Sequence, residues 1–441
     1  MKAFLTAYDP SDLPGGSIDP LGFERGYLFL ADKILPGMTN VASCPRYFGV
    51  LCAGSLLAVV STESSPRAQR AARQECILRF EKLWALANVL SARKNGKTEP
   101  SGLRGVTYAT RQRNILEEQK QTKTDCKFRL LIRQVPYGVL GIYGSVAENA
   151  RLIYKTSYEL SPGLGEPLGE AFLEETYTPQ QVKKAVREDG EVSLAVLTEW
   201  GERAYLWAKA GKRESYCISE ALHSDCIRSR FTRILAEHPF KENEPELERL
   251  KRITASFAKD PSNRDLWESA ECILRYETCY QLSMLLFERI LYLCRNRCDA
   301  SGRISIEDLD HDEVARYVRE NLPPAVSDFI HHIGSAETQH FGKGLDRLWD
   351  VERFLQQAAN SCESGSLLAD TILARHRDVQ HGKFDRGMRK MPWVQNTEGK
   401  LALTMTRVGG LTKEATEPSD IAPHPYRIYA ADNWLQAAGG S

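Results

Sequence analysis

The spacing of apolar residues along the chain predicts a mainly α-helical protein. Between residues 66 and 94, the apolar residues Ile77, Phe80 and Trp84 recur at intervals of three and four, the spacing of one face of a helix. Arginine and lysine fill the last turn of this segment, and Asn95-Gly96 ends it. We therefore expect a long helix over 66–94.

The second half of the chain continues this helical pattern. Thr178-Pro179 is typical of a helix start and Gly190 of its end. Further helices are expected at 193–210, 215–237, 245–258, 264–298, 306–320, 336–360 and 364–381. The longest carries Ile273, Tyr280 and Leu286 along one side, which predicts a central core helix.

The N-terminal part is expected to be a smaller mixed α/β region. Its first 60 residues are rich in turn signals and aromatic residues, and 104–155 shows a helix, a linker and a helix followed by glycine-punctuated aromatic turns. That layout suits a winged-helix-like module, although such turns occur in many folds. The expected domains are a mixed domain at 1–160, a helical domain at 161–390 and an extended segment at 391–441.

Composition indicates the cellular compartment that is expected but does not indicate an activity. The chain has 441 residues, 58 basic and 58 acidic, so its formal net charge is zero and any affinity for nucleic acid must come from local patches. Its most apolar run, Val50–Val60, is about half of the roughly 20 residues that a transmembrane helix needs. The opening residues do not resemble a signal peptide, and the eleven cysteines follow no pairing pattern. A cytoplasmic protein without membrane association is expected.

One local patch is strongly basic. Between residues 67 and 133 there are 16 Lys or Arg against 6 Asp or Glu. Cations on one face neutralise phosphates, so this region is a candidate for contact with DNA or RNA. The candidate residues are Arg111, Arg113, Lys123, Lys127, Arg129 and Arg133. The alternatives are a solvated helix face or a face that meets acidic residues of the same chain.

A second basic stretch, RHRDVQHGKFDRGMRKMPWV, occupies 375–394. Arg375 and His381 stand in an R-x5-H arrangement that resembles the R-x4-6-H motif of HEPN-type ribonucleases. In that chemistry the histidine exchanges a proton while the arginine stabilises charge on phosphorus. The resemblance implies a helical setting and completion of the site by a second copy, hence a homo-oligomer.

The same stretch also reads as a basic helix end that anchors a phosphate backbone or an acidic partner. Gly382 directly after His381 indicates that the helix ends there, and cations near a helix C-terminus interact favourably with its dipole. The candidate anchoring residues are Arg377, Lys383, Arg386, Arg389 and Lys390. We rank the anchoring role first and the nuclease role second.

Metal and cofactor motifs are not evident. His331, His332 and His340 lie near one another, but their spacing is neither HxxxH nor HExxH. Cys294 and Cys298 have no second pair nearby to complete a zinc site. The chain has no GxxxxGK[ST] loop, no GxSxG elbow and no dinucleotide GxGxxG, so neither a cofactor nor a metal is expected, nor an ATPase activity.

The N-terminal block DPLGFERGYLFLADKILPGMTNVASCPRYFGVLCAG resembles the opening of a group of uncharacterised bacterial proteins found in anti-phage defence islands. The matching residues are Asp19, Pro20, Leu21, Gly22, Leu35, Pro36, Gly37, Thr39, Arg46 and Tyr47. The tail also resembles that group, in which a basic H…VQ…K…PW segment follows a helix. The alternative interpretation of the N-terminal block is purely structural. In that case Leu35, Tyr47 and Phe48 are expected to be core residues, and Arg46 is expected to bind a backbone carbonyl.

The resemblance implies a context, phage defence within a multi-protein system, and no biochemical activity. The sequence thus favours a non-ATPase subunit of a bacterial defence complex that binds nucleic acid, a partner ATPase or nuclease, or both. The alternative is a HEPN-like, metal-independent ribonuclease that uses Arg375 and His381. Whether the chain is an enzyme stays open at this point.

Overall fold

The computed structural model describes residues 19–61, 63–335, 341, 344–385, 388–404 and 414–439. The described chain is mainly α-helical, as the sequence predicted, and its sheets have two or three short strands. It divides into two compact units. Unit 1 contains residues 1–33 and 247–424, and unit 2 contains residues 34–246 and 425–441.

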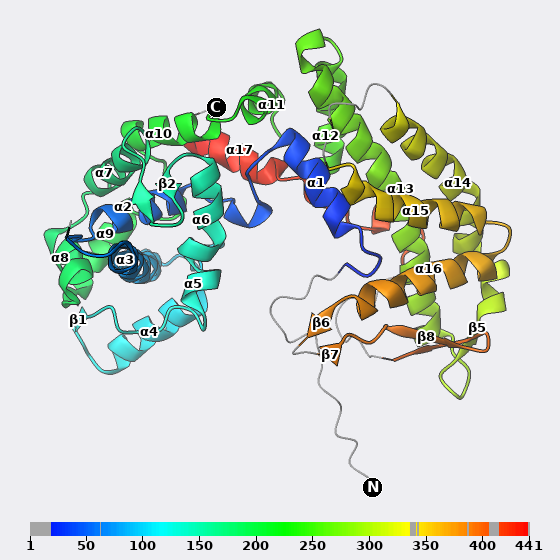
Figure 1. Cartoon of the computed structure of the whole chain (residues 1–441). Helices are drawn as coiled ribbons and strands as arrows, with labels where there is room; N and C mark the ends of the chain where they lie inside the picture. Colours follow the sequence, from blue (N-terminus) through cyan, green and yellow to red (C-terminus); the bar gives the residue numbers. More distant parts are fainter. Residues whose placement is uncertain are drawn as a thin grey trace, which may run out of the picture. The chain divides into compact units, whose positions relative to one another are not determined.

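Unit 2 is built on α3 (Pro66–Lys94), which is seen nearly end-on among its neighbours in Figure 1. The Ser65 hydroxyl accepts a hydrogen bond from the Ala68 N–H at 3.3 Å, and proline occupies the first position of the helix. α9 (Leu194–Arg203) packs against α3 at Gly201, where an added Cβ would lie 2.0 Å from the Ala87 oxygen. A glycine is therefore required for this close helix contact.

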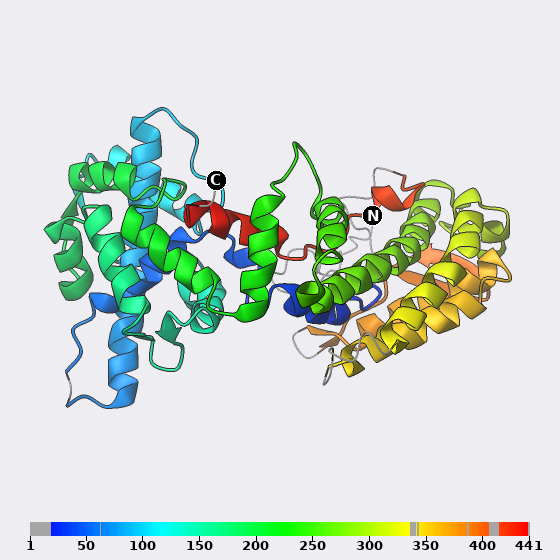
Figure 2. The ribbon, with the colours of Figure 1, turned by 90° about the horizontal axis from the view of Figure 1, so that it is seen from above.

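The other elements of unit 2 pack on α3 or on its neighbours. The helices are α2 (Arg46–Leu56), α4 (Val106–Glu118), α5 (Gln134–Tyr137), α6 (Val139–Asn149), α7 (Gly165–Glu175), α8 (Gln180–Glu188), α10 (Lys212–Leu222), α11 (Cys226–Glu237) and α17 (Ile428–Ala437). The antiparallel strand pairs are β1 (Lys123–Thr124) with β4 (Val192–Ser193), and β2 (Ile153–Tyr154) with β3 (Glu159–Leu160). The first turns of α3 extend past the neighbouring helices (Figure 2).

The region expected to resemble a winged helix has the element order α4, β1, α5, α6, β2, β3. In this region β1 pairs with β4 rather than with the β2–β3 hairpin. α6 buries Val139, Leu140 and Tyr143, so its apolar face packs inward and little of it is free to read a groove. The winged-helix assignment stays a prediction, and these two features do not support it.

Unit 1 is built on α13 (Arg264–Asn296), the expected central core helix, with α14 (Glu313–Gly334) packed along it. The Asp312 carboxylate accepts hydrogen bonds from the first N–H groups of α14. This helix continues through Pro323 and Pro324, whereas the sequence predicted an end near residue 320. The buried apolar side of α14 outweighs the loss of backbone donors at the two prolines.

Further helices and two small sheets complete unit 1, and two of these helices pack directly on this pair. The remaining elements are the helices α1 (Glu24–Ile34), α12 (Glu246–Phe257), α15 (Asp346–Asn360) and α16 (Gly365–His381), the antiparallel sheet β5 (Ile304–Ser305), β9 (Lys400–Leu403) and β8 (Val394–Thr397), and the hairpin β6 (Phe384–Asp385) and β7 (Met388–Arg389). One unit boundary falls before the last residue of α1, and another falls after the first residue of α12, so both helices belong almost wholly to unit 1.

Three expectations about boundaries differ from the structure. Each unit combines an N-terminal and a C-terminal segment, in place of consecutive domains at 1–160 and 161–390. The 391–441 segment, expected to be extended, contains α17, whose Trp434 packs on Phe48 and donates to the Ala42 carbonyl at 3.2 Å. The helix expected at 215–237 is two helices, because Asp225 caps the start of α11. All three differences arise from contacts that are not visible in the local sequence pattern.

Candidate functional site

The two catalytic candidates from the sequence, Arg375 and His381, lie on the second half of α16. The Ser364 hydroxyl caps the start of this helix by accepting the Leu367 N–H at 3.0 Å, and the helix ends at His381, as predicted. Each residue turns a helix by about 100°, so Arg375, His376 and Arg377 face different surroundings. Their roles therefore have to be considered separately.

Arg375 holds the N-terminal block to α15. Its Nε donates to the Leu21 carbonyl at 2.8 Å, and its Nη2 lies 2.6 Å from a carboxylate oxygen of Asp350. The hydrogen bond from Arg375 is the main cause that lowers the pKa of Asp350. The guanidinium also lies 5.3 Å from the ring centre of Phe354. Only 12% of the Arg375 side chain is exposed, so these contacts occupy the group.

His376 is fully buried beside Arg375. Its Nδ1 lies 3.0 Å from the Pro20 carbonyl, and the Trp393 N–H donates to its Nε2 at 2.9 Å. A carbonyl can only accept, so the proton sits on Nδ1 and the ring is neutral. Burial lowers the pKa of His376 to about 4. Both ring nitrogens are therefore used in packing the chain, and His376 is not available as an acid or base near neutral pH.

The carbonyls bound by Arg375 and His376 belong to one turn, residues 19–22. The Asp19 carboxylate accepts hydrogen bonds from the N–H groups of Gly22, Phe23 and Glu24 at 2.8 to 2.9 Å and so caps the start of α1. Lys383 donates to the Asp19 carbonyl. The 19–22 turn and the end of α16, more than 350 residues apart in sequence, thus meet through these hydrogen bonds.

His381 lies in different surroundings, on the exposed side of α16. It lines a hollow of about 330 Å³, which we call the α16 hollow. The hollow is lined by Asp370, Leu373, Ala374, Arg377, His381, Met391, Pro392, Val394, Gln395 and Asn396. Arg377 stands one helical turn before His381. Its side chain is 57% exposed, and its Nε lies 3.6 Å from a carboxylate oxygen of the exposed Asp378. The structure therefore brings His381 together with Arg377, whereas Arg375 does not line the hollow.

The other anchoring candidates of this stretch are unequally placed. Lys383 is half-buried against the 19–22 turn, whereas Arg389 is exposed and Lys390 is partly exposed. Arg386 lies outside the described residues. Arg377, Arg389 and Lys390 are thus the described members that remain accessible to a ligand.

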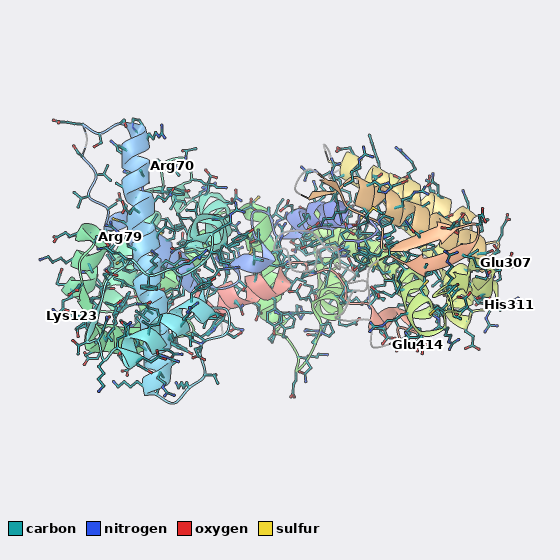
Figure 3. The ribbon with its side chains drawn as sticks, turned by 90° about the horizontal axis from the view of Figure 1, so that it is seen from below. Arg70, Arg79, Lys123, Glu307, His311 and Glu414 are labelled. Carbon is teal, nitrogen blue, oxygen red and sulfur yellow. The ribbon has the colours of Figure 1, made fainter. Side chains whose placement is uncertain are left out.

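Three of the six candidates in unit 2 already face acidic groups. Arg113 is buried and binds Glu99 at 3.2 Å. Lys123 lies 3.9 Å from Glu191, and Lys127 lies 4.0 Å from both Asp125 and Asp189. Figure 3 shows Lys123 on the same side of unit 2 as Arg70 and Arg79 of α3. Here the basic patch meets acids of its own chain, which was one of the alternatives drawn from the sequence.

Arg111, Arg129 and Arg133 differ from these three. All are exposed, and no ion pair joins them to an acid in the part of the chain that the structure describes. Arg129 lies 5.8 Å from the ring centre of Tyr108, and Arg133 lies 5.9 Å from that of Tyr137.

Exposed apolar side chains lie close to these arginines in the sequence. Ile132 is 67% exposed and Val135 is 41% exposed. Arg111 is one turn along α4 from Tyr108, which places both residues on one helix face. We call the set Tyr108, Arg111, Arg129, Ile132, Arg133, Val135 and Tyr137 the arginine surface. It combines cations with aromatic and aliphatic side chains.

Of the three histidines considered as metal ligands, His332 has a packing role. The Nε2 of His332 lies 3.1 Å from the Glu268 carbonyl, and burial lowers the pKa of His332. His340 is outside the described residues. Among the described residues, no group of three His, Cys, Asp or Glu side chains is arranged to hold a metal ion.

A larger hollow of about 710 Å³, also in unit 1, was not found from the sequence. Arg289 crosses its wall, binding one oxygen of Asp312 at 2.7 and 2.9 Å and also binding Glu414. Figure 3 shows His311 and Glu414 at this end of the unit. Arg289 and Asp312 are both buried and mutually neutralised, so their first role is to fix the start of α14 on α13.

The sequence also gave no signal for two buried carboxylates. In unit 1, Glu277 is fully buried and binds His424 Nδ1 at 2.6 Å, next to Tyr280. In unit 2, Glu81 accepts the Val139 N–H at the start of α6 and the Gln134 amide, each at 2.7 Å. Burial is the main cause that raises the pKa of Glu81 to about 7. Each pairs with a residue far away in sequence, so neither is visible as a motif.

Comparison of the chain with protein-family models, with curated proteins and with solved structures found no match. No helix within the described ranges has the length and apolar character needed to cross a bilayer. Proposals on function therefore rest on the residues themselves.

Proposed function

We propose that this chain is a nucleic-acid-binding, non-ATPase subunit of a bacterial anti-phage defence complex, in which an ATPase or nuclease partner supplies catalysis. The arginine surface carries the binding part of the proposal. Three exposed arginines without acidic partners attract phosphates, because each contact releases counterions from the nucleic acid. The complex and its biological context rest on the resemblance of the N-terminal block and the tail.

The other side chains of this surface favour a single strand. Tyr108 and Tyr137 lie under two of the arginines, and Ile132 and Val135 are exposed beside them. Unpaired bases stack on aromatic, aliphatic and guanidinium groups, whereas the stacked bases of a duplex cannot. We therefore propose that the ligand is single-stranded, with little preference for base identity.

Binding of a labelled single-stranded oligonucleotide at several salt concentrations tests this proposal. The triple variant Arg111→Gln, Arg129→Gln, Arg133→Gln should bind at least about ten-fold more weakly, and its salt dependence should fall by about 0.7 per lost phosphate contact. The matched control is Lys123→Gln with Lys127→Gln, because those exposed lysines face acids. An unchanged affinity in the triple variant would overturn the proposal.

A second function has one specific observation in its favour. Arg377 and His381 line the same hollow, and on this observation we propose as the alternative a metal-independent ribonuclease with Arg377 in the place first given to Arg375. The histidine would exchange the proton and the arginine would stabilise the phosphorane. Cleavage of single-stranded RNA in the absence of metal ions, lost in His381→Ala, is the test.

A further inference from the structure

The α16 hollow has one wall made by a single face of a helix. Asp370, Ala374, Arg377 and His381 follow one another at intervals of four, three and four residues, which places them in a stripe along α16. A rise of about 1.5 Å per residue separates Asp370 from Arg377 by about 10 Å along the helix axis. The stripe therefore has a carboxylate at one end, and a guanidinium and an imidazole at the other.

The opposite wall comes from residues 391–396, which lead into and begin β8. The Asn396 amide donates to Asp370 Oδ1 at 2.7 Å, which fixes the carboxylate at that end of the hollow. An ionised carboxylate accepts about four hydrogen bonds, so acceptor capacity remains for a ligand. Gln395 adds an exposed amide, and Met391, 56% exposed, adds an apolar surface.

The ends of this hollow differ in the ligand atoms that they can bind. Arg377 and His381 suit a phosphate, since guanidinium and imidazole groups donate to phosphate oxygens. Asp370 and the two amides suit a planar group with N–H donors, which is what the edge of an amino-bearing base offers. Leu373, Pro392 and Met391 add apolar lining. A volume of about 330 Å³ is at the lower end of ligand pockets.

From this arrangement, we propose that the α16 hollow binds one nucleotide, with the phosphate at Arg377 and His381 and a donor-bearing purine, guanine above all, at Asp370. Guanine presents two adjacent N–H donors on one edge, which a carboxylate accepts as a pair. This site is separate from the arginine surface of unit 2, which contacts a strand without selecting bases. The inference goes beyond the proposed function and does not depend on it.

Titration calorimetry of the full chain with guanosine 5′-monophosphate, adenosine 5′-monophosphate and inorganic phosphate tests the inference. Guanosine monophosphate should bind more tightly than adenosine monophosphate, and both more tightly than phosphate alone. Arg377→Ala should weaken both nucleotides at least about ten-fold. Asp370→Asn should weaken the guanine nucleotide by a similar factor and remove the preference over adenine, because a neutral amide cannot accept two N–H donors as a carboxylate does.

Arg316→Ala is the matched control, since Arg316 is an exposed arginine on α14 of the same unit and does not line the hollow. It should leave all three affinities unchanged. Circular dichroism melting curves should show that the Arg377 and Asp370 variants fold, as expected for side chains on the solvent side of α16. Equal binding of phosphate and nucleotides, or affinities that do not respond to Arg377→Ala, would overturn the inference. The triple variant of the arginine surface should bind the mononucleotides normally, so failure of either proposal is seen separately.

Discussion

Trp393 donates its backbone N–H to Nε2 of His376 at 2.9 Å, and this bond fixes the tautomer of a fully buried imidazole. The other ring nitrogen donates to the Pro20 carbonyl at 3.0 Å. A single neutral side chain on α16 therefore connects the N-terminal turn to the segment that leads into β8. A second proton on the ring would point at the Trp393 N–H and break that connection.

The stability of unit 1 should consequently fall in mild acid. The pKa of His376 is lowered from 6.5 to about 4 on folding, so below about pH 6.5 the unfolded chain binds a proton that the folded chain does not. Stability is therefore lost as the pH falls from about 6.5 to 4, by on the order of 3 kcal/mol in total. Hydrogen-exchange protection factors of the α16 amides, corrected for the intrinsic pH dependence of exchange, measure this loss. His376→Asn should flatten the dependence, while His381→Asn should leave it unchanged.

Glu81 should give unit 2 the opposite response. Its pKa is raised from 4.5 to about 7 on folding, so between these values the folded chain keeps a proton that the unfolded chain loses. This contribution to stability is present below about pH 4.5 and is lost as the pH rises through 7. The hydrogen-exchange protection factors at the start of α6, where the Val139 N–H donates to Glu81, should fall from pH 5 to 7.5 once the intrinsic pH dependence of exchange is divided out. The trend should be absent in Glu81→Gln, and a persisting trend there would assign it to another group.

Replacement of Arg375 should reduce stability rather than remove a catalytic group. Arg375→Ala takes away the donor to the Leu21 carbonyl and leaves Asp350 without its partner, a loss of about 2–4 kcal/mol. His381→Ala, at an exposed position, should change the unfolding free energy by less than about 0.5 kcal/mol. Urea denaturation distinguishes the two. A fully stable Arg375→Ala variant that had lost ribonuclease activity would restore Arg375 as a catalytic candidate.

The ion pair of Arg46 and Glu214 in unit 2 should be among the most sensitive positions of the chain. The two side chains are 5% and 0% exposed and lie 3.3 Å apart, and Arg46 also donates to the Arg203 carbonyl at 3.1 Å, the kind of contact that the sequence predicted for it. Glu214→Ala leaves a buried arginine without its counter-charge and should cost about 3–5 kcal/mol. The double variant Arg46→Met, Glu214→Leu should recover much of this loss in thermal melts, since it removes both charges.

The positions of long helices were predictable because their signals are local. α3 begins and ends at the expected residues, since Ser65, Pro66 and Asn95-Gly96 act within a single turn of the chain. α14 shows the limit of such reasoning, because its contacts with α13 carry it through Pro323 and Pro324. α17 was missed for the same reason, since its Trp434 is held by residues near the other end of the chain.

For the candidate sites, the sequence by itself identified two regions rich in basic residues. One is in unit 2, and the other is the arginine- and histidine-rich end of α16. Only the tertiary structure decided what each of these residues contacts and which stay exposed to a ligand. Arg113, Lys123 and Lys127 meet acids of their own chain, and Arg375 and His376 bind the N-terminal turn. Arg377 and His381 remain to line a hollow. Ion pairs and hydrogen bonds join residues far apart in sequence, and helix faces separate neighbours, so availability is a property of the folded chain.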